Sequence, residues 1–459
     1  MLSLKPSAAE SNVALCGRGS EMAILGSGEH LKNDIWPRSV VLWMAALYVA
    51  LFIIRPWEQL VPWLSTIRFE RIYALCMIAA VFSYPKKQLP RSFQTAAVIL
   101  FFLGIGVSAL FAWNSSLAWA PFYEYMTLLI FYFILLLVVR TPYELMFLVA
   151  CYLVAMAMYL TKSQWEYFVH GQHRYDMGVY RMVGIETTFG GPNSLAMSIV
   201  VSLPFCLFLY SVRKEFCQKW PAFWRKWLSK GPAIYLALAV SSIALTNSRS
   251  GMLSFVLFVF LVTFRGKGVG RKLGNIIIGV LILLLLWQVL PQEKKGRFRS
   301  IWDPSAAPPN ATVSAQGRKE GFRAGMTMFK RFPITGVGIG NFGEYRLLHV
   351  DGTALEAHNL AGQALGEMGL VGGATFLLMV IVTLANCRKV RVLAKGRSDP
   401  TVKILSGLAL ACRDAIILLA FEGFFGHNVR RFNWLWLAAF GVLALQYARQ
   451  RFQEMGAGR

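Results

Sequence analysis

The sequence predicts an all-α polytopic membrane protein, and three observations lead to that fold class. Of the 459 residues, 56% are apolar and only 15% are charged, whereas a soluble protein carries roughly a quarter of charged residues. The mean hydropathy is +0.50. The apolar residues gather in stretches that approach the ~20 residues a helix needs to span a bilayer. These observations exclude a soluble globule and a disordered chain, and a transmembrane β-barrel would show short alternating segments instead.

The spanning helices are assigned in chain order from these stretches. A polar segment rich in Gly and Ser at residues 1–34 comes first, without the basic start and apolar run of a signal peptide. We expect it to be a disordered cytoplasmic tail. The seventh and eighth spans are short and are joined by a polar turn. The twelve expected spans are residues 38–55, 68–84, 93–112, 119–139, 143–160, 194–211, 232–247, 250–264, 273–290, 368–386, 404–425 and 432–447.

The distribution of Lys and Arg predicts the orientation. The connections on one side, together with the C-terminal tail, carry 23 of these residues, and the connections on the other side carry 9. The long loop 291–360 is left out of this count, because long domains cross the membrane regardless of charge. Because basic loops stay in the cytoplasm, both termini are expected there. The chain then divides into a tail (1–34), spans one to nine (35–290), a periplasmic helical loop domain (291–367), and spans ten to twelve with a cytoplasmic tail (368–459).

The loop domain is far longer than a simple connection, and loops of that size are usually functional or disordered. Its first part, around residues 305–310, is rich in Pro and Ala and is expected to be flexible. A helix is expected from Arg318 until shortly before Pro333. A tight turn follows in the glycine-rich run at residues 336–342, and a second helix begins near His358 and continues into the tenth span.

Several common kinds of site are absent from the sequence. The net charge of +24 would suit nucleic acid, but the basic residues are scattered over many loops, so we expect no nucleic-acid partner. No ATPase-type phosphate loop is present. The glycines at 336–340 lack the third glycine and the preceding strand of a dinucleotide site. Without a His-Glu-x-x-His motif or an acidic outer loop, we expect neither a metal nor a cofactor.

Four basic side chains are expected on the outer side: Arg181, Arg249, Arg318 and His358. Each alone has an ordinary explanation. Arg249 could snorkel from a helix end, Arg181 and Arg318 could be solvated loop residues, and His358 could pack at a helix start, as we expect of His427. Together they suggest more, because arginines bind phosphate oxygens through paired hydrogen bonds and a neutral histidine can take a proton from a hydroxyl. That combination suits displacement of a pyrophosphate leaving group.

At these residues the chain resembles the O-antigen ligase and polymerase superfamily of bacterial envelope glycan synthesis, over about residues 175–385. Each matching segment is short, but the segments occur in the family's order. One departure is Phe322, where the family usually has Trp. The matching segments are Arg181 ahead of Pro192-Asn193, the Asn-Ser-Arg-Ser-Gly turn at 247–251, Gly-Arg at 317–318 through Phe-Pro-Ile-Thr-Gly-Val-Gly-Ile-Gly-Asn-Phe at 332–342, and Ala-His-Asn at 357–359 with Gln363, Glu367, Met368, Gly369, Leu370 and Gly372.

The resemblance implies a membrane-embedded glycosyltransferase fold of the C type in the bacterial inner membrane. It implies transfer of a glycan from undecaprenyl pyrophosphate to a sugar hydroxyl at the periplasmic face, without metal or nucleotide. By the same resemblance, His358 is the catalytic base, Arg318 and Arg249 bind and neutralise the pyrophosphate, and Arg181 is a further phosphate contact. The acceptor is lipid A-core in a ligase and the next lipid-linked repeat unit in a polymerase, and these motifs do not separate the two.

A polytopic transporter or flippase of lipid-linked glycans is the alternative. Such a protein would need charged groups within its spans, and Arg413 and Asp414 lie near the middle of the eleventh expected span. They could also simply pair and hold the helices together. A transporter should further show matched halves with broken helices, which the sequence does not. The oligomeric state is not indicated.

Overall fold

The computed structural model describes most of residues 39–457. The residues outside this description are 60, 85–88, 177–178, 186–187, 215–221, 266–267, and, between 290 and 308, all but 295, 299 and 303. The expected tail at 1–34 and part of the first half of the loop domain therefore lie outside the described residues.

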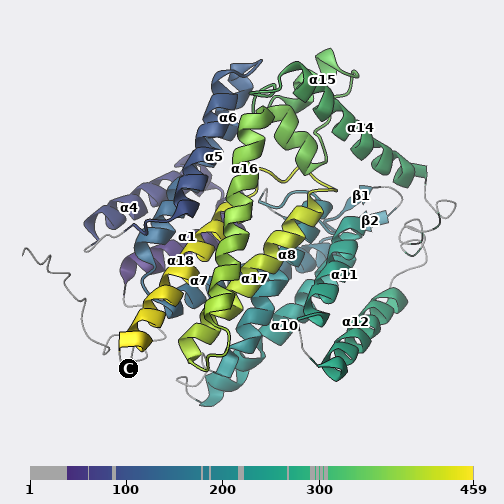
Figure 1. Cartoon of the computed structure of the whole chain (residues 1–459). Coiled ribbons are helices and arrows are strands. Elements are labelled where there is room, and N and C mark those ends of the chain that lie inside the picture. The colour runs from purple at the N-terminus through teal and green to yellow at the C-terminus, as the bar shows by residue number, and fades with distance from the viewer. Residues whose placement is uncertain are drawn as a thin grey trace, which may run out of the picture. The chain divides into compact units, whose positions relative to one another are not determined.

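The described residues form helices together with one short antiparallel strand pair, β1 (Arg174–Asp176) and β2 (Val179–Arg181), as Figure 1 shows. The helices are α1 (Val40–Ile54), α2 (Pro56–Gln59), α3 (Trp63–Thr66), α4 (Phe69–Ser83), α5 (Phe93–Leu110), α6 (Ser115–Val138), α7 (Pro142–Val169), α8 (Pro192–Ser211), α10 (Ala222–Thr246), α11 (Arg249–Thr263), α12 (Val269–Val289), α14 (Pro309–Arg331), α15 (Phe342–His349), α16 (Leu360–Leu393), α17 (Pro400–Glu422) and α18 (Asn433–Ala457).

The helical fold class is confirmed, and the chain is a multi-pass membrane protein. Each of the twelve apolar segments coincides with a helix. Among the described residues, seven helices are long and apolar enough to cross a membrane, and two further apolar helices, α1 and α11, are shorter. The count of twelve spans and the periplasmic position of the loop domain stay predictions.

Helix ends follow local sequence signals. At the start of α7, the Thr141 side chain accepts a hydrogen bond from the Glu144 backbone N–H, and the Glu144 carboxylate accepts one from the Thr141 N–H, which forms a capping box. Asp399 caps α17, with Pro400 in its first turn. These signals satisfy the amide groups that a helix start leaves without partners.

Helix α16 is central to the packing and contacts α5, α14, α17 and α18 (Figure 1). It meets α5 through small residues, since a Cβ added to Gly104 would lie 3.2 Å from the Cα of Gly372. Small residues allow the backbones of membrane helices to approach closely. This packing fixes the helix whose N-terminal end follows His358.

Three details differ from the expectation. The helix expected from Arg318 begins earlier, at Pro309. Helix α15 was not predicted, because its eight residues follow the glycine-rich turn without a long periodic pattern. The β1–β2 pair was also missed, since three-residue strands are too short to show alternation; across it, the rings of Tyr175 and Tyr180 lie 5.0 Å apart.

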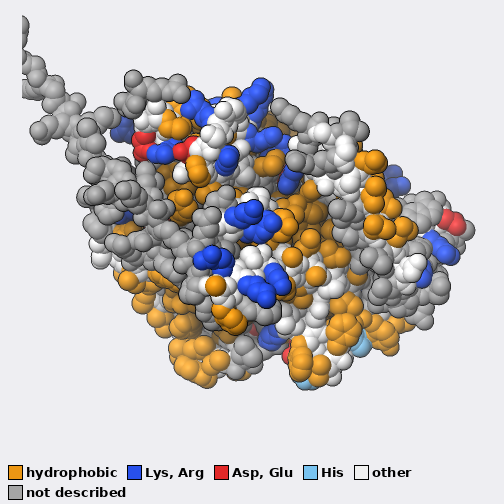
Figure 2. Space-filling model, turned by 90° about the horizontal axis from the view of Figure 1, so that it is seen from below, with side chains coloured by type: hydrophobic (Ala, Val, Ile, Leu, Met, Phe, Trp, Pro, Cys, Tyr) orange, Lys and Arg blue, Asp and Glu red, His pale blue; other side chains and the backbone are white. Residues whose placement is uncertain are grey.

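The predicted orientation agrees with the charge on one face. Figure 2 shows the face that lies below in Figure 1, the side on which the C-terminal end lies, and several groups of Lys and Arg stand out on it, with few acidic side chains. Such a face suits the cytoplasmic side of a membrane. The orientation itself remains a prediction.

Candidate active site

Helix α14 packs directly on the start of α16 through glycines. A Cβ on Gly321 would lie 2.2 Å from the carbonyl oxygen of Ala357, and a Cβ on Gly325 would lie 2.4 Å from that of Gly362. The two backbones are therefore in contact. Arg318 is one turn before Gly321, and His358 follows Ala357 directly, so this packing brings the two predicted site residues together. The Arg318 charge in turn contributes to lowering the pKa of His358.

His358 has a constrained backbone. Its φ of 46° lies in the left-handed region, which costs a non-glycine residue on the order of 1 kcal/mol. The next two residues hold it there. The Asn359 side chain accepts a hydrogen bond from the Gly362 N–H at 3.0 Å, and the Leu360 N–H donates to the Gly423 carbonyl at 2.6 Å. Strain of this kind is concentrated at functional sites.

A second histidine lies beside His358. The centroids of the His358 and His427 rings are 5.2 Å apart. Burial lowers the pKa of His358, and the charges of Arg318 and Arg346 lower it further. Burial also lowers the pKa of His427 to about 3, with contributions from His358, Arg430 and other neighbours. Both rings are therefore neutral at neutral pH.

The turn between α10 and α11 carries Arg249 as the first residue of α11. Asn247 in this turn has a φ of 48° and donates from its side-chain amide to the Tyr180 carbonyl at 2.8 Å. Ser248 caps α11 by accepting from the Gly251 N–H at 3.2 Å. The turn therefore fixes Arg249 at a helix end.

Arg181 is placed differently from the other three residues. It is only 2% exposed. Its Nε donates to the Thr246 carbonyl at 3.0 Å and its Nη2 donates to Asn193 Oδ1 at 2.7 Å. Asn193 Oδ1 also accepts from the Ser248 hydroxyl at 2.9 Å. Arg181 therefore braces the turn that carries Arg249, and its predicted phosphate contact stays a prediction.

Arg318 is surrounded by an aromatic ring and by charged side chains that include Arg249. Its guanidinium lies 5.5 Å from the centroid of the Phe425 ring, a cation–π contact. Burial lowers the pKa of Arg318, the Arg249 charge lowers it further, and Glu422 opposes both. The positive charges of Arg249 and Arg318 therefore repel each other.

Sequence reasoning missed Glu422, at the end of α17. Glu422 is 3% exposed, and its carboxylate interacts electrostatically with Arg318 and Arg431. The hydroxyls of Ser250 and Ser254 lie next to it. The carboxylate offsets part of the positive charge at this place. The missed signal was an acidic residue at the end of an apolar helix, where a charged group is unfavourable unless it is paired.

A second carboxylate group supports the site from the other side. Glu367 is 1% exposed; one of its oxygens accepts from the Gly340 N–H at 3.0 Å and the other from the Gln363 amide at 3.3 Å. The charge of Arg430 is close to both Glu367 and Glu356, and these carboxylates raise the pKa of Arg430 against the effect of burial. Glu367 thus anchors the glycine turn and the segment that carries His427.

The glycine turn is bonded into α16 at a break in that helix. Gly369 has non-helical torsions, with a φ of 59°. The Leu370 N–H donates to the Pro333 carbonyl at 2.8 Å, and the Val337 N–H donates to the Gly366 carbonyl at 2.9 Å. A Cβ on Gly336 would lie 2.3 Å from the carbonyl carbon of Glu367, so no side chain fits there. The loop replaces the helix bonds lost at the break.

An apolar cavity of about 610 Å³ is lined in part by Asn359 and Leu360, the two residues that follow His358 in the chain. Phe322, the residue that departs from the family pattern, is part of its wall. The remaining lining comes from α16, the end of α17 and the residues after it. These are Ala361, Ala364, Leu365, Gly373, Phe376, Ala420, Gly423 and Phe424.

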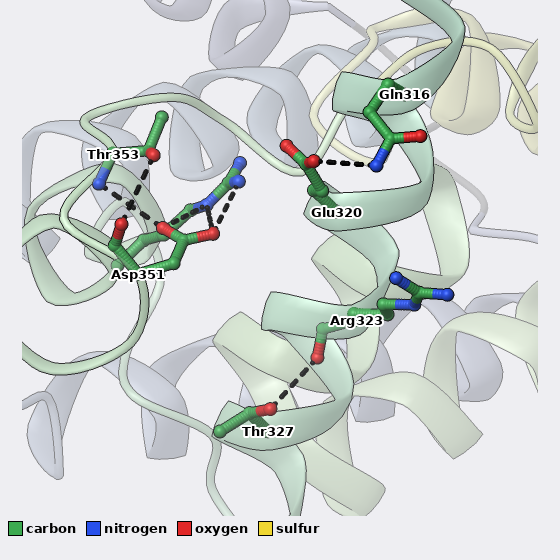
Figure 3. A network of polar contacts seen from close by, with 7 residues as sticks. Gln316, Glu320, Arg323, Thr327, Asp351 and Thr353 are labelled. Atoms are coloured by element: carbon green, nitrogen blue, oxygen red, sulfur yellow. Dashed lines mark hydrogen bonds and ion pairs between the residues drawn. The ribbon is translucent and has the colours of Figure 1, made fainter.

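The side of α14 shown in Figure 3 is polar. The exposed Gln316 amide donates to the Glu320 carboxylate at 2.9 Å, and the Thr327 hydroxyl donates to the Arg323 carbonyl at 3.1 Å (Figure 3). After α15, Asp351 accepts from the buried Arg346 at 2.7 Å and from the Thr353 N–H at 3.2 Å. These bonds hold the loop domain's surface in place.

One comparison with known protein families finds a match in this part of the chain. Residues 234–377 match the O-antigen ligase family. The match confirms the predicted resemblance to that superfamily, and its segment contains Arg249, Arg318 and His358. Arg181 and Glu422 lie outside it. No curated protein matches the chain significantly.

The glycine packing gives a test of how the site is assembled. Changing Gly321→Ala should displace α14 from the start of α16, because the new Cβ would overlap the Ala357 carbonyl. Overpacking of this kind costs about 1–3 kcal/mol of stability, and a misplacement of about 1 Å can cost about 100-fold in rate. Gly317→Ala, one turn earlier with no atom within 4 Å, is the matched control. Transfer assays and thermal unfolding of both variants check this, and equal behaviour would contradict the packing argument.

Proposed function

We propose that this protein is a metal-independent glycosyltransferase of the bacterial inner membrane. It moves a glycan from undecaprenyl pyrophosphate to a sugar hydroxyl of a glycan or lipid A-core acceptor at the periplasmic face. The observation that carries the proposal is the meeting of Arg249, Arg318 and His358. They come from three separate segments: the Arg249 charge acts on Arg318, and the Arg318 charge contributes to lowering the pKa of His358.

The donor's pyrophosphate binds between Arg249 and Arg318. Each guanidinium can donate two parallel hydrogen bonds to phosphate oxygens. Binding of the anion relieves their mutual repulsion, which the Glu422 carboxylate also reduces. The apolar cavity beside Leu360 suits part of the isoprenoid chain, whose burial is favourable by about 0.8 kcal/mol for each CH₂ group.

His358 acts as the general base in the transfer. Its neutral ring takes the proton of the acceptor hydroxyl while that oxygen attacks the anomeric carbon of the donor glycan. The bond from this carbon to the pyrophosphate oxygen breaks, and undecaprenyl pyrophosphate leaves with the electron pair. The two arginines stabilise the charge that grows on the leaving group, where preorganised electrostatics has its largest effect.

Arg181 acts through Arg249 in this scheme. Its bonds to Thr246 and Asn193 hold the turn at the start of α11. We propose that Arg181 positions the pyrophosphate site. The direct phosphate contact that the family resemblance implies stays a prediction. A transporter is the less supported function. The two residues that suggested it, Arg413 and Asp414, form an ion pair with each other.

Transfer should continue in the presence of a chelator. Among the described residues, no group of three or more His, Cys, Asp and Glu side chains could hold a metal ion, and two arginines can supply the positive charge that the leaving group needs. Purified protein should therefore form product at the same rate with and without EDTA. Loss of activity that magnesium restores would overturn the roles given to Arg249 and Arg318.

A further inference from the structure

A second cluster of arginines surrounds Asp414 of α17. The Asp414 side chain has no exposed surface. Its Oδ1 accepts hydrogen bonds from Nε and Nη2 of Arg413 at 2.8 and 2.6 Å. Its Oδ2 accepts from Nε of Arg265 at 2.9 Å and also from Nη2 of that residue. The expected pair of Arg413 and Asp414 is thus a triad that ties α17 to the end of α11.

A third arginine adds to the excess of positive charge in the cluster. Arg391, in the last turn of α16, interacts electrostatically with Arg413, Arg265 and Asp414. Within the described part of the chain, the Arg391 side chain makes no hydrogen bond or ion pair. Three positive charges against one negative charge leave a net charge of +2. A net positive charge next to the hydrocarbon of a membrane raises the free energy of the protein unless a counter-ion is bound. The cluster therefore favours binding of an anion.

The cluster opens to the surface next to apolar side chains. The side chains of Arg265 and Arg413 are 20% and 29% exposed, and Arg391 is exposed. One residue before Arg265, the Phe264 ring lies 4.5 Å from that of Phe260, and each residue is 55% exposed. Exposed guanidinium groups beside exposed rings match a ligand with an anionic head and an apolar chain.

This place is separate from the candidate active site. Arg249 begins α11, whereas Arg265 follows its C-terminal end. Fifteen helical residues separate them by about 22 Å along the helix, at 1.5 Å per residue. One pyrophosphate cannot bridge that distance. Arg391 also lies near the end of α16 from which the chain enters the predicted cytoplasmic connection to α17.

We propose that Arg265, Arg391 and Arg413 bind the phosphate of an anionic phospholipid in the cytoplasmic leaflet. Basic pockets between membrane helices on that side bind such head groups. Asp414 holds two of the guanidinium groups in place, and Arg391 adds a further positive charge. The lipid would join α11, α16 and α17 at their inner ends.

Native mass spectrometry of the purified full chain tests the proposal, after incubation with phosphatidylglycerol, phosphatidylcholine or inorganic phosphate. The wild type should retain phosphatidylglycerol in preference to phosphatidylcholine. Arg391→Gln should weaken that retention about fivefold, as expected for one surface arginine near anionic lipid. Arg449→Gln, which removes an exposed arginine near the end of α18, is the matched control and should bind like the wild type.

The same experiment can overturn the proposal. Equal retention of the two lipids, or equal loss in the Arg391 and Arg449 variants, would show that the cluster is not a specific lipid site. Displacement of phosphatidylglycerol by millimolar inorganic phosphate would assign the cluster to a soluble anion instead. Arg413→Gln provides a second variant, because it removes another guanidinium group of the cluster, and it should also retain less phosphatidylglycerol than the wild type.

Discussion

Replacing His358 with alanine should nearly abolish glycan transfer. A positioned base is worth about 10²–10⁴-fold in rate, and His358 is the neutral ring next to Arg318. Donor binding and protein yield should persist, because the pyrophosphate contacts belong to the arginines. Transfer and donor binding measured on the same preparation of His358→Ala separate the two effects.

His427→Ala is the matched control for that substitution, since its ring lies 5.2 Å from that of His358. We expect a change of less than about tenfold, as for a residue outside the proton-transfer step. His349→Ala, on α15, removes an exposed histidine that packs on Tyr345 and should leave the rate unchanged. If His427→Ala lost activity while His358→Ala kept it, the base would belong to the segment after α17.

The pH dependence of transfer follows from the same assignment. The base must be neutral, and the pKa of His358 lies below the ordinary histidine value of 6.5 because of burial and the charges of Arg318 and Arg346. Activity should therefore be retained as the pH falls from 8 to 6.5 and should decline only at lower pH. A rate that increases as the pH falls below 6.5 would contradict a neutral base.

Replacing Arg318 with alanine should lower the transfer rate by about 10²–10³-fold, the cost of removing one donor that stabilises transition-state charge. Arg318→Lys keeps the charge but loses the paired hydrogen bonds of the guanidinium, so its transfer rate should lie between those of the wild type and Arg318→Ala. Unlike the His358 variant, both changes should weaken donor binding. Equilibrium binding of the lipid donor and its turnover measure these effects.

Arg323→Ala tests whether any arginine of α14 has this effect. Arg323 lies on the same helix, and its exposed side chain points away from the other residues drawn in Figure 3. The Arg323→Ala variant should bind the lipid donor and transfer the glycan at the same rate as the wild type. Equal losses in the Arg318 and Arg323 variants would show that the helix contributes general charge and not a pyrophosphate contact.

The sequence predicted the helices well because each is long and continuously apolar, and the positions of the twelve expected segments coincide with helices. The polar turn before Arg249 and the helix after His358 were also expected, because caps and glycines mark them locally. The association of α14 with α16 was not predicted. It depends on Gly321 and Gly325, whose role can be seen only when the backbone that faces them is known.

Other site residues escaped prediction because they are distant in sequence. His427 and His358 are brought together by the end of α17, and no local pattern distinguishes the two histidines, which both precede asparagine. Glu422 was read as part of an apolar span, although Arg318 and Arg431 offset its charge. Asp414 was matched to its neighbour Arg413, while its other partner, Arg265, is 149 residues away.

The stoichiometry of polyprenyl pyrophosphate release tests the central claim most directly. The measurement uses proteoliposomes that contain the purified protein, a polyprenyl-pyrophosphate-linked glycan and a sugar acceptor. If the protein is a transferase, each transferred glycan should release one polyprenyl pyrophosphate, and His358→Ala should stop both. Movement of the intact lipid-linked glycan across the bilayer without any release would contradict the account and establish the transporter instead.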